Sequence, residues 1–195
     1  SGQCLQVLEE HTGAIRALAL SGDGRAISGS DDNTLRVWDL ESGQCLHTLA
    51  GHMGEVTSVV LYPNGQRVIS VSADATIRLW NLEDGTCLQI LRGWKDPITK
   101  VAMTQDGQRI IFISDDSSLR IWDLQKGQEL ACLFIDAASG FSVEPDSMHI
   151  VAGDSLGNIA YMLISEMVIP APPQDLLKTV AAGECVLVAG DGLSV

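Results

Sequence analysis

The sequence lacks most of the features that mark membrane-spanning, secreted and nucleic-acid-binding proteins. Its 195 residues include only 12 lysines and arginines against 25 aspartates and glutamates, a net charge of -13. Because this excess repels phosphate backbones and anionic lipids, we expect neither a nucleic acid nor a membrane as partner. No apolar run is long enough to cross a bilayer. The first residues, SGQCLQVLEE, lack the basic segment and apolar core of a signal peptide.

The sequence also lacks paired cysteines. Its five cysteines are odd in number and form no CxxC motif, which favours free thiols in a reducing compartment over disulfides or zinc sites. We therefore expect a cytoplasmic protein. Cys4, Cys45 and Cys87 occupy one position in three similar segments, where small, half-buried packing is the expected role.

Motifs of catalysis are missing as well. The sequence has no phosphate-binding loop, no HExxH zinc helix and no G-x-S-x-G nucleophile turn. The histidines His11 and His52 are far from His149 in the sequence, so we expect no metal and no cofactor. We predict a protein that is not an enzyme. A hydrolase is the less favoured alternative, with carboxylates in the irregular part of the chain: Asp136, Glu144 and Asp154.

The dominant feature that is present is an internal repeat of 42 residues. Three segments align without gaps: AISGSDDNTLRVWDLESGQCLHTL, VISVSADATIRLWNLEDGTCLQIL and IIFISDDSSLRIWDLQKGQELACL. The tryptophans Trp38, Trp80 and Trp122 keep this interval. A coincidence over so many positions is implausible, so the chain is an array of similar structural units.

Each unit has the pattern of β-strands. Leu35 and Val37 alternate with Arg36 and Trp38, and alternation of period two between turns indicates strands. Asn-Gly and Asp-Gly pairs such as Asn64-Gly65 supply the positive φ of tight hairpins. Each unit therefore predicts four short antiparallel strands. Because one such sheet cannot bury both its faces, we expect successive sheets to pack around an axis as a β-propeller.

The units resemble WD repeats, which carry a Gly-His pair near the start and a Trp-Asp pair near the end. Gly51-His52, Trp38-Asp39 and Trp122-Asp123 match, and Trp80-Asn81 is a mild departure. The resemblance covers residues 10–134. The low divergence between the repeats is similar to that in the WD arrays of NACHT and NB-ARC signalling NTPases. The resemblance implies an all-β fold, a WD-repeat β-propeller of four-stranded antiparallel blades, and a non-catalytic scaffold for protein–protein interaction.

About four and a half blades are expected. The ring is then either partial, or closed as five units with the N-terminal strand completing the last blade. The expected units are a strand d over 1–9, WD repeats over 10–50, 51–92 and 93–134, a degenerate repeat over 135–168, a Pro-rich connector over 169–179 and a partial repeat over 180–195.

The resemblance also implies a hydrogen-bonded set of His, Ser or Thr, Asp and Trp in each blade. The first two blades supply complete sets: His11, Ser28, Asp32 and Trp38, then His52, Ser70, Asp74 and Trp80. The third keeps Asp116 and Trp122 but has Trp94 and Phe112 for His and Ser. Since each unpaired buried group costs about 1–3 kcal/mol, we expect the two aromatics to make that corner apolar. A set that recurs in two blades is structural rather than a catalytic triad.

Recognition is expected on the loops of one propeller face. The resemblance implies these candidate partner-binding residues: Ala14, Arg16, Asp31, Glu55, Thr57, Ala73, Pro97, Thr99 and Asp115. Arg16 alone has typical hot-spot chemistry. We expect other proteins as partners. The net charge either favours partners with basic surfaces or, more simply, reflects a solvated acidic surface. An open ring would favour association with another copy. The alternative function is a sensor or autoinhibitory module of a larger NACHT or NB-ARC ATPase.

Overall fold

The computed structural model describes residues 2–135, 138–143, 149–154 and 158–163. These residues form fifteen strands in four antiparallel sheets. No helix among them is long and apolar enough to cross a membrane. The prediction of an all-β array of antiparallel sheets, part of a β-propeller, is confirmed. The predicted connector (169–179) and last partial repeat (180–195) lie outside the described residues.

The first three sheets each contain four strands that pair in chain order. The first sheet consists of β1 (Ile15–Leu20), β2 (Arg25–Ser30), β3 (Thr34–Asp39) and β4 (Cys45–Ala50). The second consists of β5 (Val56–Leu61), β6 (Arg67–Ser72), β7 (Ile77–Asn81) and β8 (Cys87–Leu91). The third consists of β9 (Ile98–Met103), β10 (Arg109–Ser114), β11 (Ser118–Asp123) and β12 (Gln128–Phe134). In its described part the fourth sheet has three strands, β13 (Ala138–Val143), β14 (His149–Asp154) and β15 (Ile159–Leu163).

The turn between the second and third strands is the same in three sheets. One residue there has positive φ, 68° at Asn33, 59° at Ala75 and 63° at Ser117. The aspartate before it accepts a hydrogen bond from the backbone amide two residues beyond the aspartate, as in Thr76 N–H to Asp74 Oδ1 at 2.9 Å. Such a local bond lets a short polar side chain replace backbone pairing at the tip of a hairpin. The repeated aspartate therefore shapes this turn in each unit.

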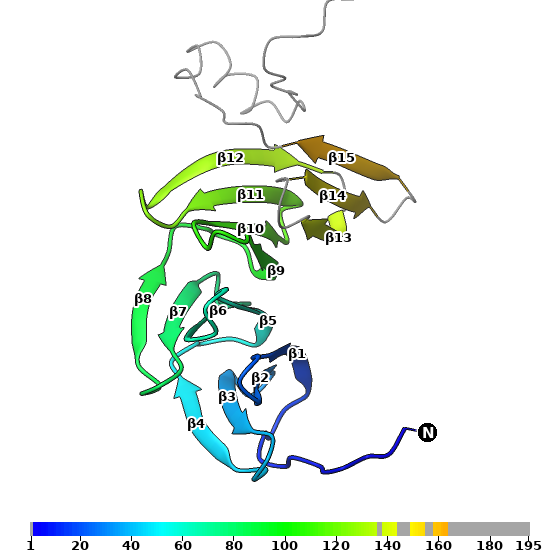
Figure 1. Ribbon diagram of the computed structural model, residues 1–195. Coiled ribbons are helices and arrows are strands. Elements are labelled where there is room, and N and C mark those ends of the chain that lie inside the picture. Colours follow the sequence, from blue (N-terminus) through cyan, green and yellow to red (C-terminus); the bar gives the residue numbers. More distant parts are fainter. Residues whose placement is uncertain (1, 136–137, 144–148, 155–157, 164–195) are drawn as a thin grey trace, which may run out of the picture.

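The four sheets follow one another along an open arc (Figure 1). The first strands, β1, β5 and β9, are neighbours on the inner side of the arc, and β4, β8 and β12 lie on the outer side. Each sheet thus has two faces. We call the face toward the preceding sheet the leading face and the face toward the following sheet the trailing face.

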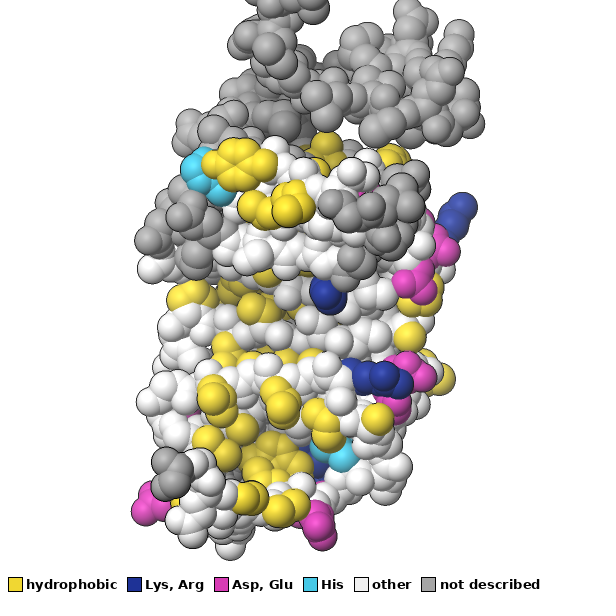
Figure 2. Space-filling view, turned by 90° about the vertical axis from the view of Figure 1, so that its right-hand side faces the viewer, with side chains coloured by type: hydrophobic (Ala, Val, Ile, Leu, Met, Phe, Trp, Pro, Cys, Tyr) yellow, Lys and Arg dark blue, Asp and Glu magenta, His cyan; other side chains and the backbone are white. Residues whose placement is uncertain are grey.

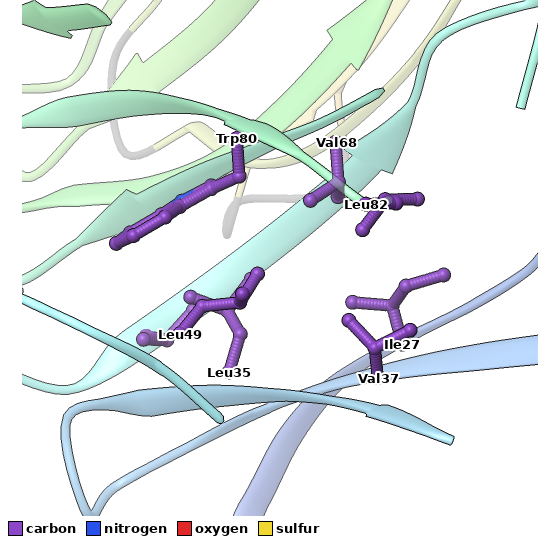
Figure 3. Packing of buried hydrophobic residues seen from close by; sticks show 8 residues of the cluster. Ile27, Leu35, Val37, Leu49, Val68, Trp80 and Leu82 are labelled. Atoms are coloured by element: carbon purple, nitrogen blue, oxygen red, sulfur yellow. The ribbon is translucent and has the colours of Figure 1, made fainter. Parts of the chain in front are cut away.

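The core lies between consecutive sheets. Between the first two sheets, Ile27, Leu35, Val37 and Leu49 of the trailing face meet Val56, Val68, Trp80 and Leu82 of the leading face (Figure 3). All of these side chains are buried. The same arrangement recurs between the second and third sheets and between the third and fourth. Along each strand, alternate residues pack against the preceding sheet and the residues between them pack against the following sheet. Because every sheet must fit two similar neighbours, the units repeat closely.

Residues 2–10 form no strand. The sequence predicts a fourth strand of a blade over 1–9, and such a strand needs a third strand to pair with. No sheet stands before β1 in the part of the chain that the structure describes. The assignment of this segment as a strand stays a prediction.

Candidate functional site

The second blade contains a buried chain of hydrogen bonds that runs from its tryptophan to its turn. Trp80 Nε1 donates to Ser70 Oγ at 2.9 Å, and Ser70 Oγ lies 2.8 Å from His52 Nε2. His52 Nδ1 lies 2.9 Å from Asp74 Oδ2. Since the carboxylate only accepts, Nδ1 carries the proton, and Nε2 accepts from the Ser70 hydroxyl. Every polar group of the chain is satisfied only when His52 is neutral.

The ionisation states of the pair agree with this proton order. Burial lowers the pKa of His52, against the opposing effect of Asp74. Burial opposes ionisation of Asp74, but hydrogen bonds from the Met53 N–H, the Thr76 hydroxyl and His52 outweigh it and lower the pKa of Asp74 to about 2. The pair is therefore a neutral imidazole beside a carboxylate around neutral pH.

The first blade repeats the geometry with the predicted residues. His11 lies 2.7 Å from Asp32 Oδ2 and 2.8 Å from Ser28 Oγ. Trp38 Nε1 donates to the same Ser28 oxygen at 2.8 Å. The structure thus brings together the four residues predicted for each of the first two blades.

The third blade has an aromatic corner in the same place. Trp94 packs edge-on against Phe112 and Trp122, with ring centroids 4.8 Å and 5.4 Å apart. Asp116 binds Ser114, Ser118 and Arg120 instead of a histidine. The buried Trp122 Nε1 has no hydrogen-bond partner among the described residues. Three aromatic rings thus fill the place that the histidine and serine occupy in the first two blades.

The polar network holds two loops together rather than offering a catalytic group. His52 and Ser70 are buried, so no substrate reaches them. Asp74, in the turn after β6, accepts the backbone N–H of Met53, in the loop before β5, at 2.8 Å. Asp32 binds Thr12 N–H in the same way at 3.0 Å. The network therefore supports the loop before the first strand and the turn after the second, where the predicted partner-binding residues lie.

These nine candidate residues gather at one end of the first three sheets. In each sheet a backbone amide of the turn donates to a carbonyl of the loop before the first strand, at 2.9 Å: Asp31 to Ala14, Ala73 to Glu55 and Asp115 to Pro97. Thr57 and Thr99 are the second residues of β5 and β9, and their hydroxyls donate to carbonyls of β6 and β10. Thr57 Oγ1 also donates to Ile98 O of the next blade at 2.5 Å. We call this set of nine residues the loop face.

Charge on the loop face is mainly negative. Arg16, 53% exposed at its side chain, binds Asp31 through two hydrogen bonds of 2.6 Å and 2.7 Å. The hydrogen bond from Arg16 lowers the pKa of Asp31, and Glu55 is close enough to help raise the pKa of Arg16. The carboxylates of Glu55 and Asp115 are exposed. The charge of Arg16 is thus balanced by Asp31, and the carboxylates of Glu55 and Asp115 leave this face with an excess of negative charge.

Sequence reasoning missed one exposed residue beside the loop face. Met53 is 86% exposed, beside Glu55 in the loop that Asp74 holds. A flexible thioether at the surface is a typical contact residue of binding surfaces. Its signal in the sequence is its place directly after Gly51-His52, where the other blades have Thr12 and Lys95.

Other predicted groups lie elsewhere or remain outside the described part. Cys4 and Cys87 are exposed, so the expectation of half-buried packing is wrong for these two. Cys87 begins the outer strand β8, which has no layer over it, and Cys4 lies in a segment that forms no strand. Of the carboxylates considered for hydrolysis, Asp136 and Glu144 lie outside the described residues, and Asp154 binds Asn158. Among described residues no group of three or more His, Cys, Asp or Glu is placed to hold a metal ion.

Comparison with known protein families decides what the array is. The family model described as WD domain, G-beta repeat matches residues 2–39, 43–81 and 85–123, which together make up more than half of the chain. The chain belongs to the WD-repeat family. The second and third matches begin two residues before the outer strands β4 and β8. The three matches end at the last residues of β3, β7 and β11.

Relatives with known names match parts of this WD-repeat chain. A probable E3 ubiquitin ligase complex SCF subunit sconB of Arthroderma otae is 46% identical over 59 residues, 30% of this chain and 9% of the relative. The WD repeat-containing protein pop1 of Schizosaccharomyces pombe is 45% identical over 65 residues, 33% of this chain and 8% of the relative. A p21-activated protein kinase-interacting protein 1-like of Danio rerio is 36% identical over 64 residues, 33% of this chain and 17% of the relative. The matches therefore span less than a fifth of these relatives.

Proposed function

We propose that the chain is a non-catalytic scaffold that binds another protein through the loop face. The observation that carries the proposal is the backbone hydrogen bond repeated in three blades, which presents equivalent side chains side by side at one end of the array. Loops on a rigid frame are suited to recognition, because little conformational entropy is lost when a partner binds. Relatives named as a ubiquitin ligase complex subunit and as a kinase-interacting protein agree with such a role.

The chemistry of the loop face favours a basic partner. Glu55 and Asp115 are exposed carboxylates without an ion pair among the described contacts, and Asp31 shares its charge with Arg16. Met53 adds an exposed apolar side chain two residues before Glu55. A segment with lysines or arginines around one apolar side chain would match both features.

The test replaces Arg16 and Glu55 together with alanine. The double variant removes one cation and one anion, so the net charge stays the same while the loop face loses its largest polar side chains. Partners captured from cells by the wild-type chain, identified by mass spectrometry, are expected to be lost. The matched control is Arg67→Ala/Glu83→Ala, which removes the same charges from exposed residues at the opposite end of the sheets.

Survival of the captured partners in the Arg16→Ala/Glu55→Ala variant would contradict the use of the loop face. Equal loss in the control variant would contradict it as well, because binding would then depend on the other end of the sheets. Salt should weaken capture if the partner is basic, since exposed charges are screened.

Three finer expectations are proposals of the same kind. The four described cysteines are free, which supports a reducing, cytoplasmic setting. The sensor module of a NACHT or NB-ARC ATPase is supported only by the regularity of the repeats, and a nucleotide-binding domain in the same gene would favour it. Self-association is supported by the open arc of sheets (Figure 1).

A further inference from the structure

An arginine recurs in the third strand of each of the first three sheets. Arg36, Arg78 and Arg120 are spaced by 42 residues, and each lies two residues before the tryptophan of its blade. Arg36 and Arg78 lie over that tryptophan, with 6.0 Å and 5.9 Å between the guanidinium carbon and the ring centroid. Arg78 is buried, with 8% of its surface exposed. The repeat therefore places a cation at the same point of all three blades.

In the first and third blades a carboxylate binds this arginine. Arg36 donates to the side chain and to the backbone carbonyl of Glu10. Arg120 donates to Glu129 at 3.0 Å and to Asp116 at 3.1 Å. Arg36 binds its carboxylate although it also lies over a tryptophan ring, so the ring contact does not take the place of the carboxylate.

Arg78, in the second blade, has no such carboxylate. Gly51 stands where the first blade has Glu10, directly before the histidine. Cys87 stands where the third blade has Glu129, opposite the tryptophan. The aspartate of the turn is already bound by the histidine, a threonine hydroxyl and two backbone amides. Arg78 thus makes no ion pair with any residue that the structure describes, and its buried Nε has no hydrogen-bond partner among them.

The surface beside Arg78 is apolar and exposed. Ile90 of the outer strand β8 lies opposite Arg78, and residues opposite each other in an antiparallel pair point to the same face. Leu88, two residues earlier in β8, shares that face because side chains of a strand alternate. Ile90 and Leu88 are 38% and 47% exposed. In the first blade the residue opposite the arginine is the polar Thr48, so this apolar surface distinguishes the second blade from the first.

A second cation, Arg92, extends this surface. The equivalent residues Ala50 and Phe134 lie opposite the first residues of β3 and β11, which places Arg92 diagonally across from Arg78. Such neighbours lie about 7–8 Å apart, within reach of two long side chains. Arg92 is exposed and makes no ion pair among the described residues. Dark blue side chains are few and scattered on the inner side of the arc, which Figure 2 shows, whereas these two arginines lie toward the outer strand.

We propose that the second blade binds an acidic peptide segment of a partner protein at Arg78, Leu88, Ile90 and Arg92, which we call the outer arginine site. A carboxylate of the segment binds Arg78, as carboxylates bind the equivalent arginines of the neighbouring blades, and an adjacent apolar side chain packs on Leu88 and Ile90. A buried guanidinium without a counter-charge is costly, so the empty site favours an anion. The outer arginine site is separate from the loop face and has the opposite charge preference.

Selection from a phage-displayed library of random decapeptides tests the occupant. The net charge of -13 repels acidic peptides in general, so their enrichment requires a local basic site. On the wild-type chain we expect peptides with aspartate or glutamate next to a large apolar residue. Arg78→Met keeps an unbranched side chain over Trp80 without the charge and should enrich none of them. In a synthetic copy of the best acidic peptide with an amidated C-terminus, glutamine for the acidic residue should raise the dissociation constant at least about tenfold.

A carboxylate supplied by the chain itself gives a second test. Cys87→Glu places a carboxylate where Glu129 binds its arginine in the third blade. It should therefore bind Arg78, abolish capture of the acidic peptide and raise the thermal midpoint by roughly 2–4 °C. Cys87→Gln is the matched control, because it has the same shape without the charge and should leave peptide binding unchanged.

Thermal unfolding separates a binding residue from a structural one. Arg120→Met leaves two carboxylates without their partner and should lower the thermal midpoint by roughly 2–4 °C, whereas Arg78→Met removes an unpaired cation and should not lower it. Equal losses would mean that Arg78 is structural and would overturn the proposal.

The selection has clear contrary outcomes as well. No enrichment of acidic peptides by the wild-type chain, or equal enrichment by Arg78→Met, would overturn the outer arginine site. Displacement of the peptide by inorganic phosphate at concentrations where acetate has no effect would assign the site to a phosphate group instead of a carboxylate. Arg16→Ala/Glu55→Ala should select the same acidic peptides as the wild type, which separates this result from a failure of the loop face.

Discussion

The clearest prediction concerns Ser70, the hydroxyl at the centre of the network in the second blade. Ser70 Oγ accepts from Trp80 Nε1 at 2.9 Å and lies 2.8 Å from His52 Nε2, and both rings are buried. Ser70→Ala leaves two buried polar groups without a partner. Since each such group costs about 1–3 kcal/mol, the variant should lose about 2–6 kcal/mol of the free energy of unfolding.

Urea unfolding followed by circular dichroism measures this loss, at a constant protein concentration because self-association would add to stability. The control is Ser42→Ala, at an exposed turn serine that binds Asp39, which should change the free energy by no more than about 0.5 kcal/mol. A loss for Ser70→Ala as small as for the control would refute the account of the network.

The third blade supplies a rescue for the same experiment. His52→Trp with Ser70→Phe copies the aromatic corner of Trp94 and Phe112 into the second blade. Each single change leaves the other member of the His52–Ser70 pair without its partner, whereas the double variant removes both members and leaves only Trp80 Nε1 unpaired, as Trp122 Nε1 is in the third blade. The double variant should therefore cost less than the sum of the two singles by about 1 kcal/mol or more. Additive losses would mean that the two positions do not form one unit.

Two further predictions concern pH and packing. The pKa of Asp74 is lowered from 3.8 to about 2, so the folded state favours the carboxylate; its contribution to stability is complete above the unfolded pKa and is lost as the pH falls from about 4 toward 2. Asp74→Asn should therefore be less stable than the wild type at neutral pH by about 2 kcal/mol, with a difference that shrinks as the pH falls over this range in urea unfolding; a constant difference would contradict the assignment. Gly29→Ala should lower the thermal midpoint and cost about 1–3 kcal/mol, because its Cβ would lie 2.6 Å from Val56 Cγ1 of the next sheet, whereas Gly22→Ala has no atom within 4 Å and should be neutral. Equal midpoints for the two glycine variants would disprove the close approach.

Much of this architecture was predictable because its signals are local. Strand positions follow from the alternation of Leu35 and Val37 with Arg36 and Trp38, since successive side chains of a strand point to opposite faces. The partners of the polar network follow from repetition of the same four residue types at one interval. The loss of two of them together in the third blade predicted an aromatic corner at Trp94 and Phe112, where the rings are now seen in contact.

The candidate surface was less predictable, because it depends on partners that are distant in sequence. Arg16 has hot-spot chemistry as a residue type, but the structure pairs it with Asp31 and so removes most of its charge from the loop face. Met53 is marked only by following His52, and its exposure depends on how Asp74 holds the loop. The unpaired Nε1 of Trp122 is another outcome of packing, as its indole is the same residue type as the bonded Trp38 and Trp80.

The sequence by itself determined the strands, the turns and the register of the polar network, because alternation, turn residues and repeat spacing act within a few residues or within one unit. Only the tertiary structure decided which apolar positions are covered. Leu18 and Val59 are aliphatic residues at equivalent positions, because they pair with Ser28 and Ser70 of the next strands. Yet Leu18 is 72% exposed and Val59 packs into a core. The difference arises because a sheet buries a face only where another sheet packs on it. Among the described residues that condition holds between consecutive sheets and is unmet at the two ends of the arc.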